Sequence, residues 1–269
     1  MSYEINDVEF KKLSALLYDI SGISLSDAKK VLLTGRLSKR LVALGLDNYT
    51  QYHKYVTQPA HADELRFMVD LLTTNETYFF RESAHFDFLK QIVPASLNPG
   101  QVYRVWSAAA SIGAEAYTIA MVLADQLGVE ARWEILGTDI SDSVLEKASS
   151  GHYRLAEADK IPTHYLKKYC LKGTGDQAGT FLIDRNLRRH VSFEPLNLNV
   201  EGMKKMGEFD VIFLRNVLIY FDIPTKQRVV ANLIRSLKTG GYMIVGHSES
   251  LNGITDALSS VKPTIYRRL

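Results

Sequence analysis

A short polar segment follows a predicted buried strand near the end of this chain. The run from Phe209 to Leu214 is almost entirely apolar, and Arg215, Asn216 and Tyr220 come directly or shortly after it. Open α/β sheets bind their ligands beyond the carboxyl ends of the strands. The three polar residues therefore lie where a ligand is expected, although an aromatic residue such as Tyr220 can also simply cover the end of a sheet.

Two more positions could take part in such a site. The turn from Ala108 to Glu115 holds small residues and one glycine before a helix, so a ligand could approach its backbone and the free N–H groups of the helix. Many turns of this kind are simply tight. Asp139 ends a second predicted strand, where a carboxylate can accept hydrogen bonds from both hydroxyls of a ribose. Asp139 is also well suited to capping the helix that begins near Ser141, so both roles stay open.

The first third of the chain predicts helices. Apolar residues recur at helical spacing in three stripes, and Gly22 and Gly45 stand where the first two helices should end. We therefore expect a helical N-terminal domain and linker over residues 1–90, and a turn at Asn98–Gly100 near the start of a second domain over residues 91–269. The stripes are Phe10, Leu13, Leu17 and Ile20; Leu33, Leu37, Leu41 and Leu44; and Leu65, Met68, Val69 and Leu72.

Beyond residue 100, strands and helices alternate, which favours a parallel, doubly wound sheet. Ser143 and Glu146 have capping-box spacing in the second helix, and Gly240-Gly241 is expected to close the last one. The expected strands are Val102–Ser107, Trp133–Thr138, Val191–Leu198, Phe209–Leu214, Tyr242–Val245 and Thr264–Arg267, and the expected helices cover Ile119–Leu127, Val144–Ala148 and Thr225–Leu237.

One stretch shows neither the spacing of a helix nor that of a buried parallel strand. Residues 171–184 combine three glycines with short alternating segments, which is typical of a β-hairpin. We therefore expect a small antiparallel β-subdomain inserted at about residues 168–190.

Composition excludes several classes of protein. A formal net charge of +2, from 32 basic and 30 acidic residues, argues against a nucleic-acid partner. A single cysteine, Cys170, excludes an internal disulfide and a cysteine-rich metal site and fits a reducing cytoplasm. The acidic N-terminus does not fit a signal peptide, and no apolar run approaches the roughly 18 residues of a membrane span. We expect a soluble, cytoplasmic protein without a metal site or direct membrane insertion.

Six motifs, in order and at matching spacing, resemble the chemotaxis receptor methyltransferases, the CheR family. The resemblance covers essentially the whole chain. It implies an α/β class I methyltransferase fold, with a Rossmann-like doubly wound sheet, an all-helical N-terminal domain and an inserted β-subdomain. It also implies methyl transfer from S-adenosylmethionine to glutamate side chains of methyl-accepting chemoreceptors, with S-adenosylhomocysteine as the product. The motifs are Leu72–Glu82, Arg104–Ser111, Thr138–Ser141, Gly151–Tyr153, Phe209–Asp222 and Gly246–Ser250.

The same resemblance implies the site residues. Asp139 would bind the ribose of the cofactor. Arg81 and Tyr220 are candidate catalytic residues, since a guanidinium can grip a carboxylate bidentately and a phenol can donate one directed hydrogen bond. The other cofactor-binding residues that it implies are Asn75, Thr77, Arg81, Glu115, Asn197, Leu198, Arg215 and Asn216.

The expected chemistry needs no general base. A free glutamate side chain has a pKa of about 4.3, so its carboxylate is already the nucleophile at neutral pH. In-line placement of the reacting atoms is the main requirement. His247 is therefore expected to cap or pack rather than to catalyse.

Candidate substrate-binding residues include a group of basic side chains on the second helix. Lys29, Arg36, Lys39 and Arg40 lie in a stretch with no acidic residue between Asp27 and Asp47. Such a run is commonly a solvated face. The alternative is a docking surface for the acidic methylation helices of a receptor, which the family resemblance favours.

The hairpin supplies the other substrate-binding candidates. In family members that bind a receptor's C-terminal tail peptide, the β-subdomain carries Arg-Gly-x-Gly-x-x-x-Gly and a second arginine. Here Gly173, Gly175 and Gly179 are kept, but Lys172 replaces the first arginine and Leu182 the second. The glycines could simply form turns. If a peptide adds to the edge of the hairpin, we expect a weak tether.

The turn after the first strand departs from the family pattern. Ile112, Ala114 and Ala116 replace Thr, Glu and Pro, while Glu115 is kept, so we expect cofactor binding to persist. A non-catalytic cofactor-binding or receptor-scaffold protein of the same fold is the first alternative. A nucleic-acid methyltransferase is disfavoured by the charge and by the lack of an Asn/Asp-Pro-Pro-Tyr/Phe motif. A nicotinamide dehydrogenase is disfavoured by the lack of Gly-x-Gly-x-x-Gly.

Overall fold

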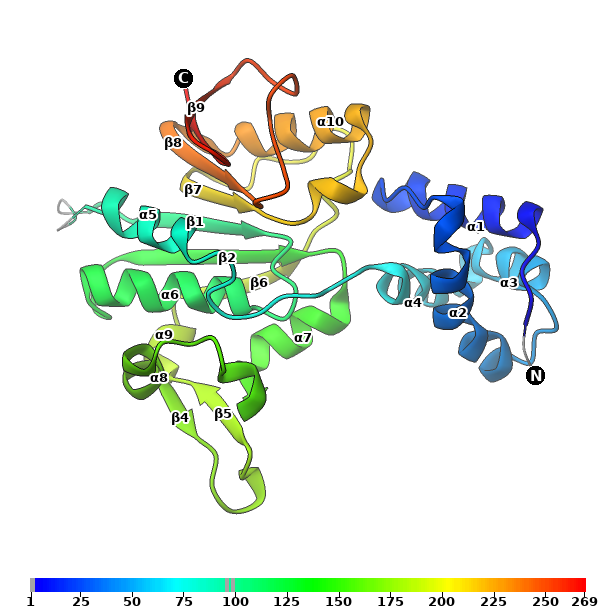
Figure 1. The fold of residues 1–269 in the computed structure, drawn as a ribbon, viewed down its shortest axis with the longest axis horizontal. Helices are drawn as coiled ribbons and strands as arrows, with labels where there is room; N and C mark the ends of the chain where they lie inside the picture. The colour runs from blue at the N-terminus through cyan, green and yellow to red at the C-terminus, as the bar shows by residue number, and fades with distance from the viewer. Residues whose placement is uncertain (1–2, 95–96, 98–99) are drawn as a thin grey trace. The chain divides into compact units, whose positions relative to one another are not determined.

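A computed structural model describes residues 3–94, 97 and 100–269. Contacts divide the chain into two units (Figure 1): Met1–Thr74 with Tyr220–Lys226, and Asn75–Ile219 with Gln227–Leu269. This division comes before the boundary expected near residue 90, because helix α5 (Ala84–Ile92) packs on helix α6 (Ala114–Leu127) of the second unit. Of the expected turn at Asn98–Gly100, Asn98 and Pro99 lie outside the described residues.

The first unit is helical. Helix α1 begins at a capping box in which Asn6 and Glu9 each accept a hydrogen bond from the other's backbone N–H. Helices α1 and α2 end at Gly22 and Gly45, as predicted, and both glycines have left-handed backbone, with φ of 77° and 65°. The helices are α1 (Asp7–Ser21), α2 (Lys30–Leu44), α3 (Tyr49–Val56) and α4 (Ala62–Leu72).

Residues of the three predicted stripes form the core of this unit. Helix α3 was not predicted, because two tyrosines, Tyr49 and Tyr52, and not an aliphatic stripe form most of its buried face. The buried stripe residues are Phe10, Leu13, Leu17, Leu33, Leu37, Leu41, Met68, Val69 and Leu72.

The second unit is organised around a seven-stranded sheet with the order β6-β2-β1-β7-β8-β10-β9 (Figure 1). Neighbouring strands from β6 to β8 pair in parallel, whereas β10 pairs antiparallel with β8 and β9. The predicted doubly wound sheet is therefore confirmed. The strands are β1 (Tyr103–Ala108), β2 (Trp133–Asp139), β6 (Val191–Pro195), β7 (Phe209–Leu214), β8 (Leu237–Val245), β9 (Leu258–Lys262) and β10 (Ile265–Arg268).

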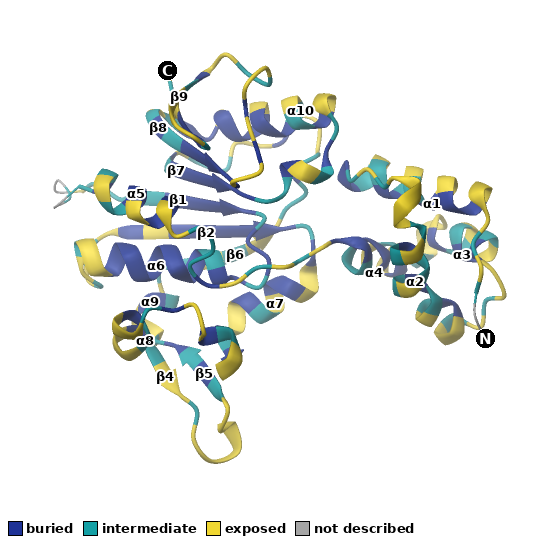
Figure 2. Ribbon diagram, viewed as in Figure 1, coloured by how far each residue is buried: buried dark blue, intermediate teal, exposed yellow. Residues whose placement is uncertain are grey.

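Strand order determines where a ligand is expected. From β1 the chain adds β2 and β6 on one side and then returns to add β7 on the other. The order thus reverses between β1 and β7, the type of position where such sheets bind ligands. Helix α6 packs on β1, β2 and β6, and helix α7 (Asp142–Ser150) packs on β2 and β6. Buried residues accordingly concentrate in the central strands and in α6 (Figure 2).

The predicted β-subdomain is a three-stranded antiparallel sheet with the order β3-β5-β4. Its strands are β3 (His152–Arg154), β4 (Cys170–Lys172) and β5 (Thr180–Ile183), with helices α8 (Thr163–Tyr169) and α9 (Arg185–Arg188) beside them in the chain. Strand β3 lies outside the expected insertion because its three residues show no strand period of their own.

Two local predictions were wrong. Helix α10 covers Ile223–Ile234, and Gly240-Gly241 lies inside β8 instead of closing the helix. A Cβ on Gly241 would lie 2.8 Å from the Asp210 carbonyl oxygen, so glycine permits the close approach of β8 to β7 where their register shifts. The residue that caps α7 is Ser141 and not Ser143, because the Ser141 hydroxyl accepts from the Val144 N–H.

Strand β9 was also not predicted, since most of its side chains are exposed or half-buried. Within the described part of the chain, no helix combines the length and the apolar character needed to cross a membrane.

Candidate functional site

The sheet brings together the ends of β1 and β7, where the sequence placed its candidate residues. The two strands pair in parallel with Ser107 beside Phe213, so the residues that follow each strand emerge at the same edge. Arg215 and Asn216 follow β7, and the turn from Ala109 to Gly113 follows β1. The predicted convergence of these two segments is therefore present.

Non-glycine residues with left-handed backbone are concentrated in the same region. Ala109 and Ser111 in the turn after β1 have φ of 76° and 50°, and Asn216 after β7 has φ of 58°. Phe80 and Glu82, with φ of 57° and 56°, lie in the segment before α5. Such conformations cost free energy and persist where surrounding contacts impose them, which is common at functional sites.

Arg215 is the centre of a buried charge network. Its Nη1 donates to Glu115 Oε2 at 2.8 Å, and its Nη2 donates to Glu82 Oε2 at 2.9 Å and to the Arg81 carbonyl at 2.5 Å. The Ser107 hydroxyl donates to the other oxygen of Glu115 at 2.7 Å. The network thus joins β1, the start of α6, the end of β7 and the segment before α5.

Glu82 is held as a carboxylate by its neighbours. Burial alone would raise the pKa of Glu82, but the hydrogen bond and charge of Arg215, with bonds from the Asn216 amide and the His247 N–H, hold this pKa below its ordinary value. Glu82 and Glu115 share one guanidinium, so this cluster carries an excess of negative charge.

A second buried carboxylate fixes the end of β7 to the end of β8. Glu249 Oε2 accepts from the backbone N–H groups of Asn216 at 2.8 Å and Gly246 at 2.6 Å, and Oε1 accepts from that of Ile219 at 3.3 Å. Burial raises the pKa of Glu249 despite these bonds. A Cβ on Gly246 would lie 2.8 Å from Glu249 Oε2, so glycine leaves room for this close packing.

Asp139 binds backbone N–H groups at the end of β2. Its Oδ2 accepts from Ser111 at 2.8 Å and its Oδ1 from Ser141 at 3.1 Å. It therefore orders both the turn after β1 and the start of α7. A carboxylate offers about four lone-pair sites, so these bonds are compatible with ribose hydroxyls as additional donors.

Asn197 and Leu198 lie close to Asp139 through the pairing of β6 with β2. The Leu196 N–H donates to the Asp139 carbonyl at 2.8 Å, which sets the course of the chain beyond β6. Leu198 is buried, and the Asn197 side chain accepts from the Asn199 N–H at 3.0 Å.

The segment before α5 also reaches the turn after β1. The Ser111 hydroxyl donates to the Asn75 carbonyl at 2.8 Å. Thr77, two residues further along this segment, is half-buried. Arg81 donates to the Glu76 carbonyl at 2.8 Å. Because a guanidinium has five N–H donors, this bond does not preclude a ligand carboxylate.

The residues that depart from the family pattern are packed in the core of the second unit. Ala114 and Ala116 are fully buried in α6, so their small size fits the helix to its surroundings. The Ile112 carbonyl accepts from the Tyr153 hydroxyl at 2.6 Å. Glu115 nevertheless reaches Arg215 from the first turn of α6, where a carboxylate is favoured by the helix dipole.

Two of the basic candidates on α2 have partners inside the first unit. Arg40 forms a bidentate ion pair with Glu64, and Arg36 donates to the carbonyls of Leu71 at 3.0 Å and Thr73 at 2.7 Å. Both arginines thus tie α2 to α4, whereas Lys29 and Lys39 are exposed. Of the proposed docking residues, only these two lysines present their side chains mainly to solvent.

Among the candidates in the hairpin, one side chain is exposed and the three glycines have structural roles. Lys172 is exposed in β4, an edge strand of the small sheet. Gly175 and Gly179 have positive φ, of 56° and 85°, and a Cβ on Gly173 would lie 2.0 Å from the Gln177 carbonyl oxygen. The three glycines are therefore required by the turn itself, whatever it binds.

Tyr220 belongs to the first unit. It ends the short 3-10 helix Leu218–Tyr220, is half-buried, and its carbonyl accepts from the Ser24 N–H at 2.9 Å. Its catalytic role stays a prediction.

Sequence reasoning did not assign Ser107, Glu82 or Glu249 to the site. Glu82 and Glu249 both lie within motifs that were singled out, but each is glutamate among polar neighbours, and its burial depends on chain segments far away in the sequence. One sequence signal could have identified Glu249. It is a glutamate three residues after the glycine that follows an apolar strand, as in Gly246-His-Ser-Glu.

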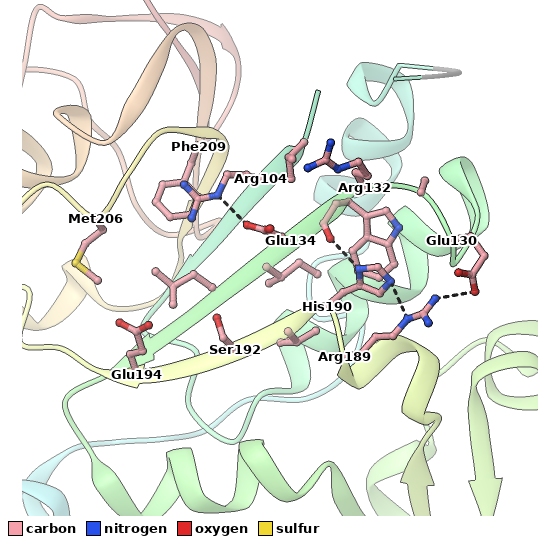
Figure 3. Close-up of a pocket in the computed structure, with 16 residues that line it drawn as sticks. Arg104, Glu130, Arg132, Glu134, Arg189, His190, Ser192, Glu194, Met206 and Phe209 are labelled. Atoms are coloured by element: carbon pink, nitrogen blue, oxygen red, sulfur yellow. Dashed lines mark hydrogen bonds and ion pairs between the residues drawn. The ribbon is translucent and has the colours of Figure 1, made fainter. Parts of the chain in front are cut away.

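A pocket of about 580 Å³ lies at a different part of the second unit (Figure 3). Residues at the beginnings of strands line it, including Arg104, Trp133 and Phe209. Four of its charged groups form two ion pairs, Arg104 with Glu134 at 3.2 Å and Arg189 with Glu130 at 2.7 Å. Because open α/β sheets bind ligands at the carboxyl ends of strands, we do not assign the site to this pocket.

Comparison with known proteins identifies both units. The family model for the CheR methyltransferase SAM binding domain matches residues 75–267, and that for the CheR methyltransferase all-alpha domain matches residues 8–73. Chemotaxis protein methyltransferases match nearly the full chain. That of Escherichia coli K12 is 40% identical, over 97% of this chain and 91% of that protein. That of Salmonella typhimurium is 39% identical, over 97% and 90%. Chemotaxis protein methyltransferase 2 of Pseudomonas aeruginosa is 37% identical, over 96% and 92%.

Proposed function

Because this chain belongs to the CheR methyltransferase family, whose members use S-adenosylmethionine to methylate proteins in chemotaxis, we propose that it esterifies glutamate side chains of chemoreceptors. The observation that carries the proposal is the match of both family domains, together with 40% identity over 97% of the chain. The cytoplasmic domain of a methyl-accepting receptor is the proposed partner, and the cytoplasm is the proposed location.

The residues at the ends of β1, β2 and β7 fit the cofactor chemically. S-adenosylmethionine supplies a methyl group on a positively charged sulfur, and its methionine part carries an ammonium group. Glu82 and Glu115 share the single guanidinium of Arg215, so their excess negative charge is complementary to these cations. We assign Asp139 to the ribose, since its carboxylate lies beside the turn after β1.

The other proposed cofactor residues surround this core. Asn216 and the Asn75 carbonyl are held in place by Glu249 and Ser111 respectively, so both positions are fixed before a ligand binds. Asn197 and Leu198 would lie against the adenosyl part. Thr77 and Arg81 would contact the cofactor from the segment before α5.

For the proposed methyl transfer, the protein has to orient the substrate and exclude water. The receptor carboxylate is ionised at neutral pH, so no side chain has to remove a proton. Arg81 is proposed to grip that carboxylate, and Tyr220 to donate one hydrogen bond to it. Desolvation favours the transfer because the anionic carboxylate and cationic sulfur become a neutral ester and a neutral thioether.

The decisive experiment incubates the chain with methyl-labelled S-adenosylmethionine and membranes that contain chemoreceptors. We expect label on the receptor that mild base releases as methanol, because methyl esters hydrolyse readily. Receptor glutamates changed to alanine serve as the control. Cofactor binding is measured separately by calorimetry: binding without any base-labile label would identify a non-catalytic scaffold instead.

We expect the two exposed lysines, Lys29 just before α2 and Lys39 within it, to contribute to receptor docking. Replacing Lys29 and Lys39 with alanine should slow receptor methylation about two- to thirtyfold at low salt, since each exposed charge contributes about 0.2–1 kcal/mol. Added salt should reduce the difference by screening. Cofactor affinity should not change. The matched control replaces Lys12 and Lys54, which are exposed on α1 and α3. Equal rates for the two double variants at low ionic strength would show that α2 is a solvated face.

We expect the edge strand β4 to bind a receptor tail weakly. An acidic, aromatic-containing C-terminal pentapeptide should bind with a Kd of about 1 mM, because Lys172 offers a point charge and Leu182 offers none. Lys172→Ala should weaken this binding by up to about fivefold, whereas Lys167→Ala, which removes an exposed lysine of α8, should not change it. Titration by NMR measures both. If no peptide binds at millimolar concentration, the hairpin is structural and docking depends on the helical unit.

A further inference from the structure

Three potential metal ligands converge near the start of α5. Glu82, His85 and His247 each offer one ligand atom, and these atoms lie within 4.8 Å of one another. His85 Nδ1 lies 3.4 Å from Glu82 Oε2, and His247 Nε2 lies 4.0 Å from the same oxygen. Ligands at about 2.0–2.1 Å from a tetrahedral zinc ion stand about 3.3 Å apart. Small side-chain movements would therefore complete a coordination sphere.

The His85 imidazole is oriented toward this cluster by its other nitrogen. Nε2 lies 2.8 Å from Thr264 Oγ1, and the Thr264 hydroxyl donates to the Pro263 carbonyl at 2.6 Å. Oγ1 is thus left to accept a hydrogen bond, which assigns the proton to Nε2 and the lone pair to Nδ1. A hydrogen bond to the distal nitrogen is the usual support of a metal-ligating histidine.

The lone pair of His85 Nδ1 has no partner in the described part of the chain, although the side chain is only 2% exposed. Glu82 Oε2 lies 3.4 Å from this nitrogen, and the same oxygen accepts from Arg215 Nη2 at 2.9 Å and from the His247 N–H at 3.2 Å. A buried imidazole nitrogen without a partner is costly, and a cation held between it and the carboxylate would satisfy it.

The other two ligands, Glu82 and His247, differ in their surroundings: one is held in place and the other is exposed. Glu82 is held by Arg215 and the Asn216 amide, so its oxygen is fixed before a cation arrives. The His247 side chain is 56% exposed, and with His85 it lines a pocket of about 550 Å³. The pocket provides a path by which an ion can enter from solvent.

We propose that Glu82, His85 and His247 bind one divalent transition-metal ion, with zinc as the best match and water completing the coordination. Two imidazoles and one carboxylate form a donor set that suits zinc. The ion would share Glu82 with Arg215. The sequence predicted no metal site, because the third ligand is far from the other two in the chain.

The test titrates zinc into the full chain after treatment with a chelator, in the absence of S-adenosylmethionine, and follows binding by calorimetry. We expect one ion per chain. His247→Ala, which removes the exposed ligand, should weaken binding at least about tenfold, and Thr264→Ala should weaken it about 10–100-fold by releasing the His85 ring. His164→Ala is the matched control, since it removes an exposed histidine of α8, and it should have no effect.

Circular dichroism establishes that each variant is folded. The proposal is overturned if no saturable binding occurs below about 0.1 mM zinc, or if folded His247→Ala binds as tightly as the unmodified chain. Neither result depends on methyl transfer, so the zinc site and the proposed function are tested separately.

Discussion

Replacing Arg215 with alanine is expected to lower the free energy of unfolding by about 3–5 kcal/mol and to abolish cofactor binding, the largest effect that we predict. The Arg215 side chain is 2% exposed, and it pairs with Glu82 at 2.9 Å and with Glu115 at 2.8 Å. Without the guanidinium, two partly buried carboxylates remain close together with no cation. One of them must take up a proton, or the segment before α5 must move away. Chemical denaturation followed by circular dichroism measures the stability, and calorimetry measures binding of S-adenosylmethionine.

Two variants separate the charge network from a general loss of arginine. Arg235→Ala removes an exposed arginine from the second unit and should change stability by no more than about 0.5 kcal/mol. Arg215→Lys keeps the charge but not the fork of donors that reaches both carboxylates, so an intermediate stability is expected. If Arg215→Ala unfolds at the same denaturant concentration as the unmodified chain, the network does not hold these elements together.

Much of the fold was predictable because local patterns agree with the final packing. Strand β2 begins at the predicted residue, Trp133, since its apolar run is buried whatever surrounds it. Gly22 and Gly45 end helices because only glycine adopts left-handed backbone at little cost. Strands β3 and β9 were missed for the opposite reason. They form because they pair with β5 and β10, whereas their own residues show little alternation of apolar and polar side chains.

The site was predictable only where position in the sheet determines it. Arg215 and Asn216 follow an apolar strand, so their place was clear from the sequence. The function of a charged side chain elsewhere depends on partners that are distant in the chain. Arg40 looked like a docking residue, because nothing in the α2 segment indicates that Glu64 on α4 forms an ion pair with it. Glu82 was missed for the same reason, as its partner Arg215 comes more than a hundred residues later.

Asp139 has structural contacts that complicate any test of its proposed role toward the ribose. Its carboxylate accepts from the N–H groups of Ser111 and Ser141, so removing it loosens the turn after β1 as well as the start of α7. A fall in cofactor affinity alone would therefore not distinguish a direct contact from a disordered turn. The comparison needs one variant that keeps an oxygen for these N–H groups and another that loosens the start of α7 without touching the carboxylate.

We expect Asp139→Ala to weaken binding of S-adenosylmethionine tenfold or more, which corresponds to about 1.4 kcal/mol, because two ribose hydroxyls lose a charged acceptor. Asp139→Asn keeps one side-chain oxygen for a backbone N–H but loses the charge, so it should bind the cofactor nearly as weakly while unfolding closer to the unmodified chain. Ser141→Ala is the converse control: it removes the cap of α7, at a cost of about 1 kcal/mol in stability, and should leave cofactor affinity unchanged. Calorimetry and denaturation on all three variants separate the two contributions. Unchanged affinity in folded Asp139→Asn would mean that Asp139 only orders the turn and the helix, and that the ribose is bound elsewhere.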